Sequence, residues 1–221
     1  MPIARSTLAG AATGVVLLVG AVGFGVGLPK VVDDPAAAST TLPTLPDRLD
    51  DRFTALQSIT AEEAGMTTPE QTAQFDDFTK RSVDAEKKAQ KNLSDEYGAA
   101  AVRGYLDVPD AGSQQTAAPT LAVTVVPGSP GLLNPQGPFA IDQNGGHYEL
   151  KEVQGKRCAM TWNEQVDPTT GVPTGQPPTG ADYSVQCRTE SKGLTYDITS
   201  NGLTPDEVVG YLDKVVELAE A

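Results

Sequence analysis

The sequence predicts an α+β protein with an N-terminal transmembrane helix, followed by an antiparallel sheet of about five to six strands covered by a central and a C-terminal helix. Three observations predict this: an uncharged N-terminal run, two cysteines placed symmetrically about a Pro/Gly-rich stretch, and a capped amphipathic segment at the C-terminus. They divide the chain into four parts, namely a short cytoplasmic tail (1–7), a transmembrane helix (8–28), a Pro/Ala-rich linker (29–46) and one extracytoplasmic domain (47–221).

The run at residues 8–28 contains no charged residue and follows Arg5. As a helix it would be roughly 31 Å long, about the thickness of one bilayer core. The alternative is a signal peptide that is cleaved, which would leave a secreted protein. The nearest small-residue cleavage site, 36–38, lies about ten residues beyond the run, which favours the uncleaved anchor.

The charges beside the run set its orientation. Arg5 and the free amine lie on the short side, whereas Lys30 on the other side is accompanied by two aspartates. The positive-inside rule therefore predicts a cytoplasmic N-terminus and an extracytoplasmic C-terminal domain in the cell membrane. Gly10 and Gly14 have the small-xxx-small spacing at which two membrane helices approach closely, so a weak homodimer through them is a further expectation.

The composition argues against one class of partner. The formal net charge is −13, and 39% of the residues are apolar. A surface this acidic repels phosphate backbones, so no nucleic-acid partner is expected. The apolar content is sufficient for the core of one domain.

The two cysteines indicate a β-hairpin. Cys158 and Cys187 are equidistant from the middle of the stretch 163–180, so they face each other if this stretch is a hairpin loop. The same register gives the ribbon one apolar face and one polar face, as strands require. We therefore expect a Cys158–Cys187 disulfide, with free thiols in a reducing compartment as the alternative. Two sulfurs and His147 make an incomplete zinc set, so no metal or cofactor is expected.

The remaining strands are predicted from short segments rich in Tyr, Val, Thr and Ile. Four form a meander and another, 121–126, is a fifth strand, whereas 99–106 fits either a strand that pairs with it or a helix; together they place the sheet within 99–199. The four meander segments are 147–153, 157–163, 182–189 and 194–199.

Helices are expected before and after the sheet segment in the sequence. The stretch 47–93 is mainly helical in pattern, with a cap at Thr68, although 52–60 fits either a strand or a helix. The clearest helix is 204–220, where Thr204 and Glu207 form a capping box before an apolar stripe. We expect this helix to lie over the sheet as a lid.

Candidate functional residues are few, and no catalytic residue is predicted. The hairpin register sets Arg157 opposite Arg188, a like-charge contact that marks a candidate anion or partner site unless a carboxylate such as Glu152 or Glu190 lies between them. His147, the only histidine, is a weaker alternative for general-base chemistry. Because no nucleophile motif accompanies it, a surface histidine beside a turn is the favoured interpretation.

The layout, with the cysteine strands CAMTWN and YSVQCRTE and the final helix LTPDEVVGYLDKVV, resembles uncharacterised membrane-anchored extracytoplasmic proteins of high-GC Gram-positive bacteria. This resemblance implies a cell-envelope location and a helix-plus-sheet fold, and it implies no activity. The plan is also similar to small α+β domains of some bacterial lipoproteins, although the lipidated cysteine of that pattern is missing.

Two functions remain as hypotheses. The favoured one is a non-enzymatic envelope protein whose outer domain binds another envelope protein or a small ligand. The alternative is a surface-tethered hydrolase or transferase, for which His147 with a polar partner in a pocket, or two paired carboxylates, would be the signature.

Overall fold

The computed structural model describes residues 41–108, 118–131, 133 and 145–220. The predicted transmembrane helix and the glycines Gly10 and Gly14 lie outside these residues. Within the described part, no helix is long and apolar enough to cross a membrane.

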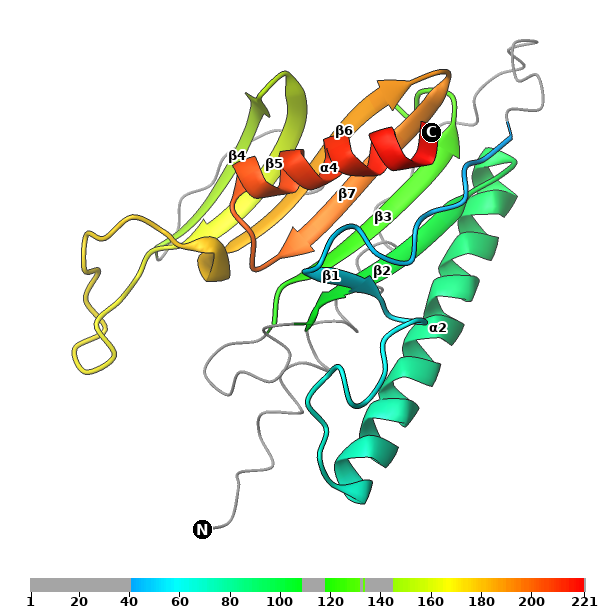
Figure 1. Cartoon of the computed structure of the whole chain (residues 1–221). Helices are drawn as coiled ribbons and strands as arrows, with labels where there is room; N and C mark the ends of the chain where they lie inside the picture. The colour runs from blue at the N-terminus through cyan, green and yellow to red at the C-terminus, as the bar shows by residue number, and fades with distance from the viewer. Residues whose placement is uncertain (1–40, 109–117, 132, 134–144, 221) are drawn as a thin grey trace.

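The described residues form one antiparallel sheet of seven strands with a helix on each face (Figure 1). The strand order is β1-β2-β3-β7-β6-β5-β4, and the last four strands in sequence are the predicted meander. The strands are β1 (Phe53–Ala55), β2 (Ala101–Asp107), β3 (Thr120–Pro127), β4 (Gly146–Val153), β5 (Lys156–Asn163), β6 (Tyr183–Ser191) and β7 (Leu194–Asn201), with a short 3-10 turn, η1 (Gly180–Asp182), before β6.

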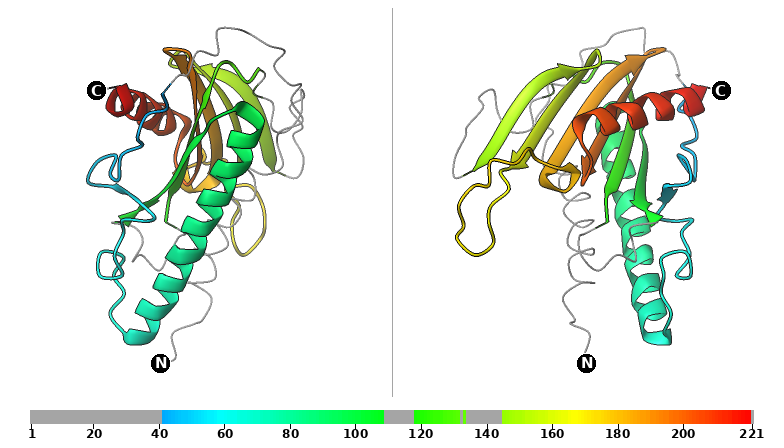
Figure 2. Two further views of the ribbon diagram at one scale, coloured as in Figure 1. Left: turned by 90° about the vertical axis from the view of Figure 1, so that its right-hand side faces the viewer. Right: turned by 60° about the vertical axis from the view of Figure 1, so that its left-hand side comes forward.

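The two helices lie on opposite faces of the sheet, as the side view shows (Figure 2). Helix α4 (Pro205–Glu220) crosses the face over β6 and β7, and α2 (Pro69–Tyr97) packs against β2 and β3 on the other face. The main core lies under α4. Four side chains of this helix are completely buried there, Val208, Val209, Leu212 and Val215, which confirms the predicted apolar stripe and its position as a lid.

The sheet has more strands than expected because two ambiguous segments are extended. Residues 101–107 form β2, which pairs with β3, and the segment 52–60 contributes the three-residue strand β1 followed by turns. All three residues of β1 and four of the seven residues of β2 are buried, and β1 pairs with a strand far away in sequence. Such packing decides between strand and helix where local propensity does not.

The region 47–93 is less helical than expected, because α2 begins only at Pro69. In the residues before it, polar side chains bond to nearby backbone groups instead of lining a helix. Asp50 accepts hydrogen bonds from the backbone nitrogens of Arg52 and Phe53, at 2.8 and 3.1 Å. Such local bonds compete with helix formation. The predicted cap at Thr68 is confirmed, with Gln71 completing its capping box.

The end of the predicted linker belongs to the domain. Leu45 is buried in the main core together with Leu49, and Leu42 packs against the same cluster. An extended Pro-containing segment can therefore contribute apolar side chains to a core without forming a helix or strand. The domain therefore begins before residue 47, at which the sequence analysis had placed its start.

The edge of the sheet at β2 is closed by side-chain contacts. Only residues 105–107 of β2 pair with β1, and beyond them the Gly104 nitrogen donates to Glu86 of α2 at 2.8 Å. The Glu86 side chain is largely buried, which raises the pKa of its carboxyl even though the Gly104 bond opposes this shift. This contact and the short β1 strand leave little of this edge available to another chain.

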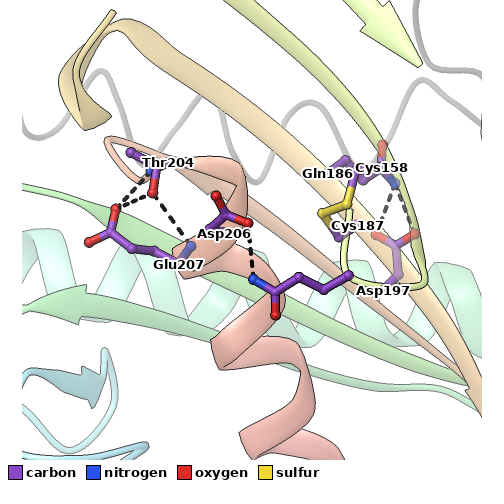
Figure 3. Close-up of a disulfide and its surroundings, with 8 residues drawn as sticks. Cys158, Gln186, Cys187, Asp197, Thr204, Asp206 and Glu207 are labelled. Atoms are coloured by element: carbon purple, nitrogen blue, oxygen red, sulfur yellow. Dashed lines mark hydrogen bonds between the residues drawn. A yellow bond between two sulfur atoms is a disulfide. The ribbon is translucent and has the colours of Figure 1, made fainter. Parts of the chain in front are cut away.

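The start of α4 has the predicted capping box. Glu207 Oε2 accepts from the Thr204 hydroxyl at 2.7 Å and from the Thr204 nitrogen at 2.9 Å (Figure 3). Burial alone would raise the pKa of Glu207, but these bonds and Arg52 hold it below its ordinary value. The cap therefore fixes the helix that covers the core.

We expect Thr204→Ala to lower the free energy of unfolding by about 1 kcal/mol, because the first turn of α4 loses its side-chain partners. Urea denaturation followed by circular dichroism measures the change. Thr204→Ser, which keeps the hydroxyl, is the matched control and should lose little. Equal losses for the two variants would show that the hydroxyl does not contribute.

Candidate functional site

The predicted disulfide is present and joins the central strands of the meander. Cys158 of β5 and Cys187 of β6 are directly opposed and bonded, and both are fully buried under α4 (Figure 3). The predicted register is confirmed between the two strands, with Met160 opposite Val185 and Trp162 opposite Tyr183. The bond therefore links two neighbouring strands on the apolar face that α4 covers.

Arg157 and Arg188 are opposed as the register predicts, but their side chains turn to different carboxylates. Arg188 reaches Asp197 of β7 through both Nε and Nη2, each 2.9 Å from Oδ2. Arg157 lies 3.7 Å from Glu190. Glu190 is thus the partner of Arg157, as one of the two predicted carboxylates. The pairing of Arg188 with Asp197 was not predicted. Aligning the last hairpin of the meander, β6 with β7, would have found it, because Arg188 and Asp197 are opposed across these strands.

Asp197 is the centre of a polar cluster on the sheet face opposite α4. Gln186 donates to both of its carboxylate oxygens, at 2.8 and 2.9 Å, in addition to Arg188. The Asp197 side chain is only 14% exposed. Burial raises its pKa, and the charge of Arg188 and the bond from Gln186 oppose this rise. The guanidinium of Arg188 is already bonded to the Asp197 carboxylate. Arg188 therefore pairs with a group of this chain rather than with an external anion.

His147 lies beside Trp162 at the end of the sheet where β4 and β5 meet the long connection to β6. Its ring stacks on the Trp162 indole with centroids 5.0 Å apart, and its Nε2 is 2.9 Å from Glu164 Oε1. Trp162 in turn packs against Tyr183 at 5.9 Å. The three rings form a row across neighbouring strands in which each ring packs against the next. The histidine therefore has a carboxylate partner, which is one half of the signature stated for an enzyme.

The connection between β5 and η1, residues 164–179, is an ordered projection that we call the arm (Figure 1). A bridge joins Val166 to Pro173, and Asp167 accepts bonds from two backbone nitrogens in the turn that follows. Those bonds hold the pKa of Asp167 below its ordinary value. Val166 and Val172 are 51% and 58% exposed. The arm thus presents apolar side chains on a structured loop, which sequence analysis had treated only as a hairpin loop.

Arg52 is a second residue that sequence analysis did not single out. Its guanidinium bonds through Nε to the fully buried Asp107 of β2 and lies 3.3 Å from Glu207 of α4. It therefore connects the segment before β1, the sheet and the cap of α4. We assign it a structural role.

Within the described residues, no group of three or more His, Cys, Asp and Glu side chains could hold a metal ion. No family model matches the chain, and comparisons with curated proteins and with solved structures give no match either.

Proposed function

We propose that the chain is a single-pass membrane-anchored protein of the cell envelope whose extracytoplasmic domain is a non-enzymatic binding module for another envelope protein or a small ligand. The observation that carries this proposal is the buried Cys158–Cys187 disulfide. Structural disulfides persist in oxidising compartments, and the uncharged run at 8–28 supplies the means of export and anchoring.

The position of the core supports a domain held close to the membrane. Leu42 already packs against the domain, so the free linker between the span and the domain is at most residues 29–41. Fully extended, such a linker reaches about 43 Å. A partner of this domain would therefore be bound within a short distance of the bilayer surface.

The arm is the binding surface that we assign to an envelope partner. Val166 and Val172 are the most exposed of the large apolar side chains in the described residues. Ordered loops that project from a rigid sheet are frequent sites of recognition. The internal bonds of the arm reduce the entropy that would be lost on binding.

Export and anchoring are tested with the full-length chain in a Gram-positive host of high GC content. We expect the intact chain to remain in the membrane pellet after carbonate washing, to be degraded by protease added to intact protoplasts, and to react with maleimide only after reduction. A soluble intact chain whose cysteines are labelled without reduction would contradict the proposal.

Binding is tested in the same cells with a photoreactive amino acid in place of Val172. We expect a discrete cross-linked product that Val166→Asp reduces. The matched control carries the photoreactive residue at Leu218, which is exposed by 43% on α4. Identical products from both positions would reject the arm as a specific surface.

A second candidate function is a tethered hydrolase or transferase, and the contact between His147 and Glu164 is the observation that favours it. A carboxylate bonded to a ring nitrogen fixes the orientation of a histidine that acts in general acid–base catalysis. Any ester or glycoside hydrolysis by the purified chain should then be lost in both His147→Gln and Glu164→Gln. Activity that survives in both variants would reject this site.

A further inference from the structure

Strand β4 forms one margin of the sheet, and among the described residues its strand neighbour is β5 (Figure 1). The Glu164 nitrogen donates to the Gly145 carbonyl, so the hydrogen-bonded pairs of this hairpin involve the odd-numbered residues of β4. The backbone groups of Leu150 and Glu152 consequently point away from β5. A margin of this kind can accept a further strand.

The side chains of β4 suit a second copy of the same strand. Leu150 is 41% exposed, and Glu149 and Lys151 flank it on the other face of the sheet, 3.0 Å from each other. In an antiparallel pair with its two-fold axis at Leu150, the two leucines oppose each other. Glu149 of each copy then faces Lys151 of the other, which gives two pairs of unlike charge.

The register of this pairing follows from the same residues. Backbone alternation permits an axis at Leu150, where outward-pointing groups of both strands meet. Displacing one strand by two residues keeps that alternation. In one direction Glu149 then faces Glu149 of the second copy, and in the other direction Lys151 faces Lys151 of the second copy. Like charges directly opposed are destabilising, so the charge pattern selects the axis at Leu150.

We propose that β4 is a self-association edge, through which two copies of this chain pair antiparallel about Leu150 and join their sheets into one. The partner is thus a second copy of the chain, independent of any ligand of the arm. A two-fold contact of this kind is self-complementary and needs no other component. Attachment to one membrane would raise the effective concentration of the two copies.

Cysteine cross-linking of the full-length chain in membranes tests the geometry. Opposed α-carbons in a hydrogen-bonded antiparallel pair are about 5.5 Å apart, which is within disulfide reach. We expect Leu150→Cys to give a disulfide-linked dimer on mild oxidation. Leu218→Cys, with a similar exposure of 43%, is the matched control and should not. Peptide mapping verifies that Cys158 remains bonded to Cys187. Equal cross-linking at both positions would overturn the proposal.

Charge reversal tests the register. In the Leu150→Cys background, Glu149→Lys or Lys151→Glu turns both unlike pairs into like pairs and should weaken dimerisation about tenfold. The double reversal restores unlike charges and should restore the dimer, whereas no restoration would reject this register.

Gly10→Leu with Gly14→Leu separates any contribution of the N-terminal run. If these two glycine substitutions abolish the Leu150→Cys cross-link, β4 does not associate by itself.

Discussion

Replacing both Cys158 and Cys187 by alanine is expected to lower the free energy of unfolding by about 3 to 4 kcal/mol. The bond closes a loop with a sequence separation of 29 residues, and the chain-entropy account gives a loss of this size when such a loop is opened. This is a large fraction of the stability of an ordinary domain. Urea denaturation of the variant and of the parent measures the loss.

Two controls make the cysteine result specific. Parent protein unfolded in the presence of a reductant should approach the stability of the double variant, whereas the reductant should not affect the variant itself. A loss below about 1 kcal/mol would mean that the unfolded chain is already compact around this hairpin. The bond would then contribute little to stability.

Arg188→Gln is expected to cost about 2 to 4 kcal/mol at neutral pH, because it removes the guanidinium from a mostly buried carboxylate, Asp197. Arg157→Gln is the matched control. Its side chain is 57% exposed and 3.7 Å from Glu190, and surface ion pairs contribute about 0 to 1 kcal/mol. Similar losses for the two variants would contradict the assignment of Arg188 to an internal ion pair.

The pH dependence of the Arg188→Gln deficit has a definite sign. Burial raises the pKa of Asp197 in the folded state, and Arg188 opposes that rise, so removing Arg188 raises this pKa further. A carboxyl whose folded pKa exceeds its unfolded value of 3.8 favours folding as the pH falls toward 3.8. The deficit of the variant should therefore shrink on acidification. Urea titrations at pH 7 and near pH 4.5 measure the difference, and a constant deficit would contradict the role of the charge.

The same two arginine variants also address the candidate anion site. If Arg157 and Arg188 bind a ligand together, their combined replacement should abolish ligand binding. A change in melting temperature alone would support their structural role, which is the interpretation that their separate carboxylates favour.

The hairpin around the cysteines could be predicted from sequence because strands have a period of two. Once Cys158 opposed Cys187, every neighbouring pair followed, and the opposed arginines were found in the same way. Asp197 was missed because the next hairpin was not aligned residue by residue. The tight turn before Leu194 places Asp197 opposite Arg188, so this pair could have been predicted from sequence.

Other features depend on packing between distant parts of the chain. Whether residues 52–60 are extended is decided by Tyr105 and its neighbours on β2, and no local pattern contains that information. Glu86 lies at helical spacing from Ser82 and Leu93 on the buried face of α2, and its bond to the Gly104 nitrogen depends on where β2 packs. The order of the arm likewise arises from bonds among its own polar groups, although its composition is that of an ordinary loop.

The unequal margins of the sheet limit how far copies of this chain can add to one another. At the β1 margin, residues 47–49 bond to the outer side of β1, and Glu86 occupies the Gly104 nitrogen of β2 beside it. At the β4 margin, the outward backbone groups are those that the proposed pairing uses. Head-to-tail stacking requires two open margins per molecule, and only such stacking propagates into a filament. Growth through β4 alone is self-limiting at two molecules, so this chain should resist amyloid-like polymerisation even when it is crowded.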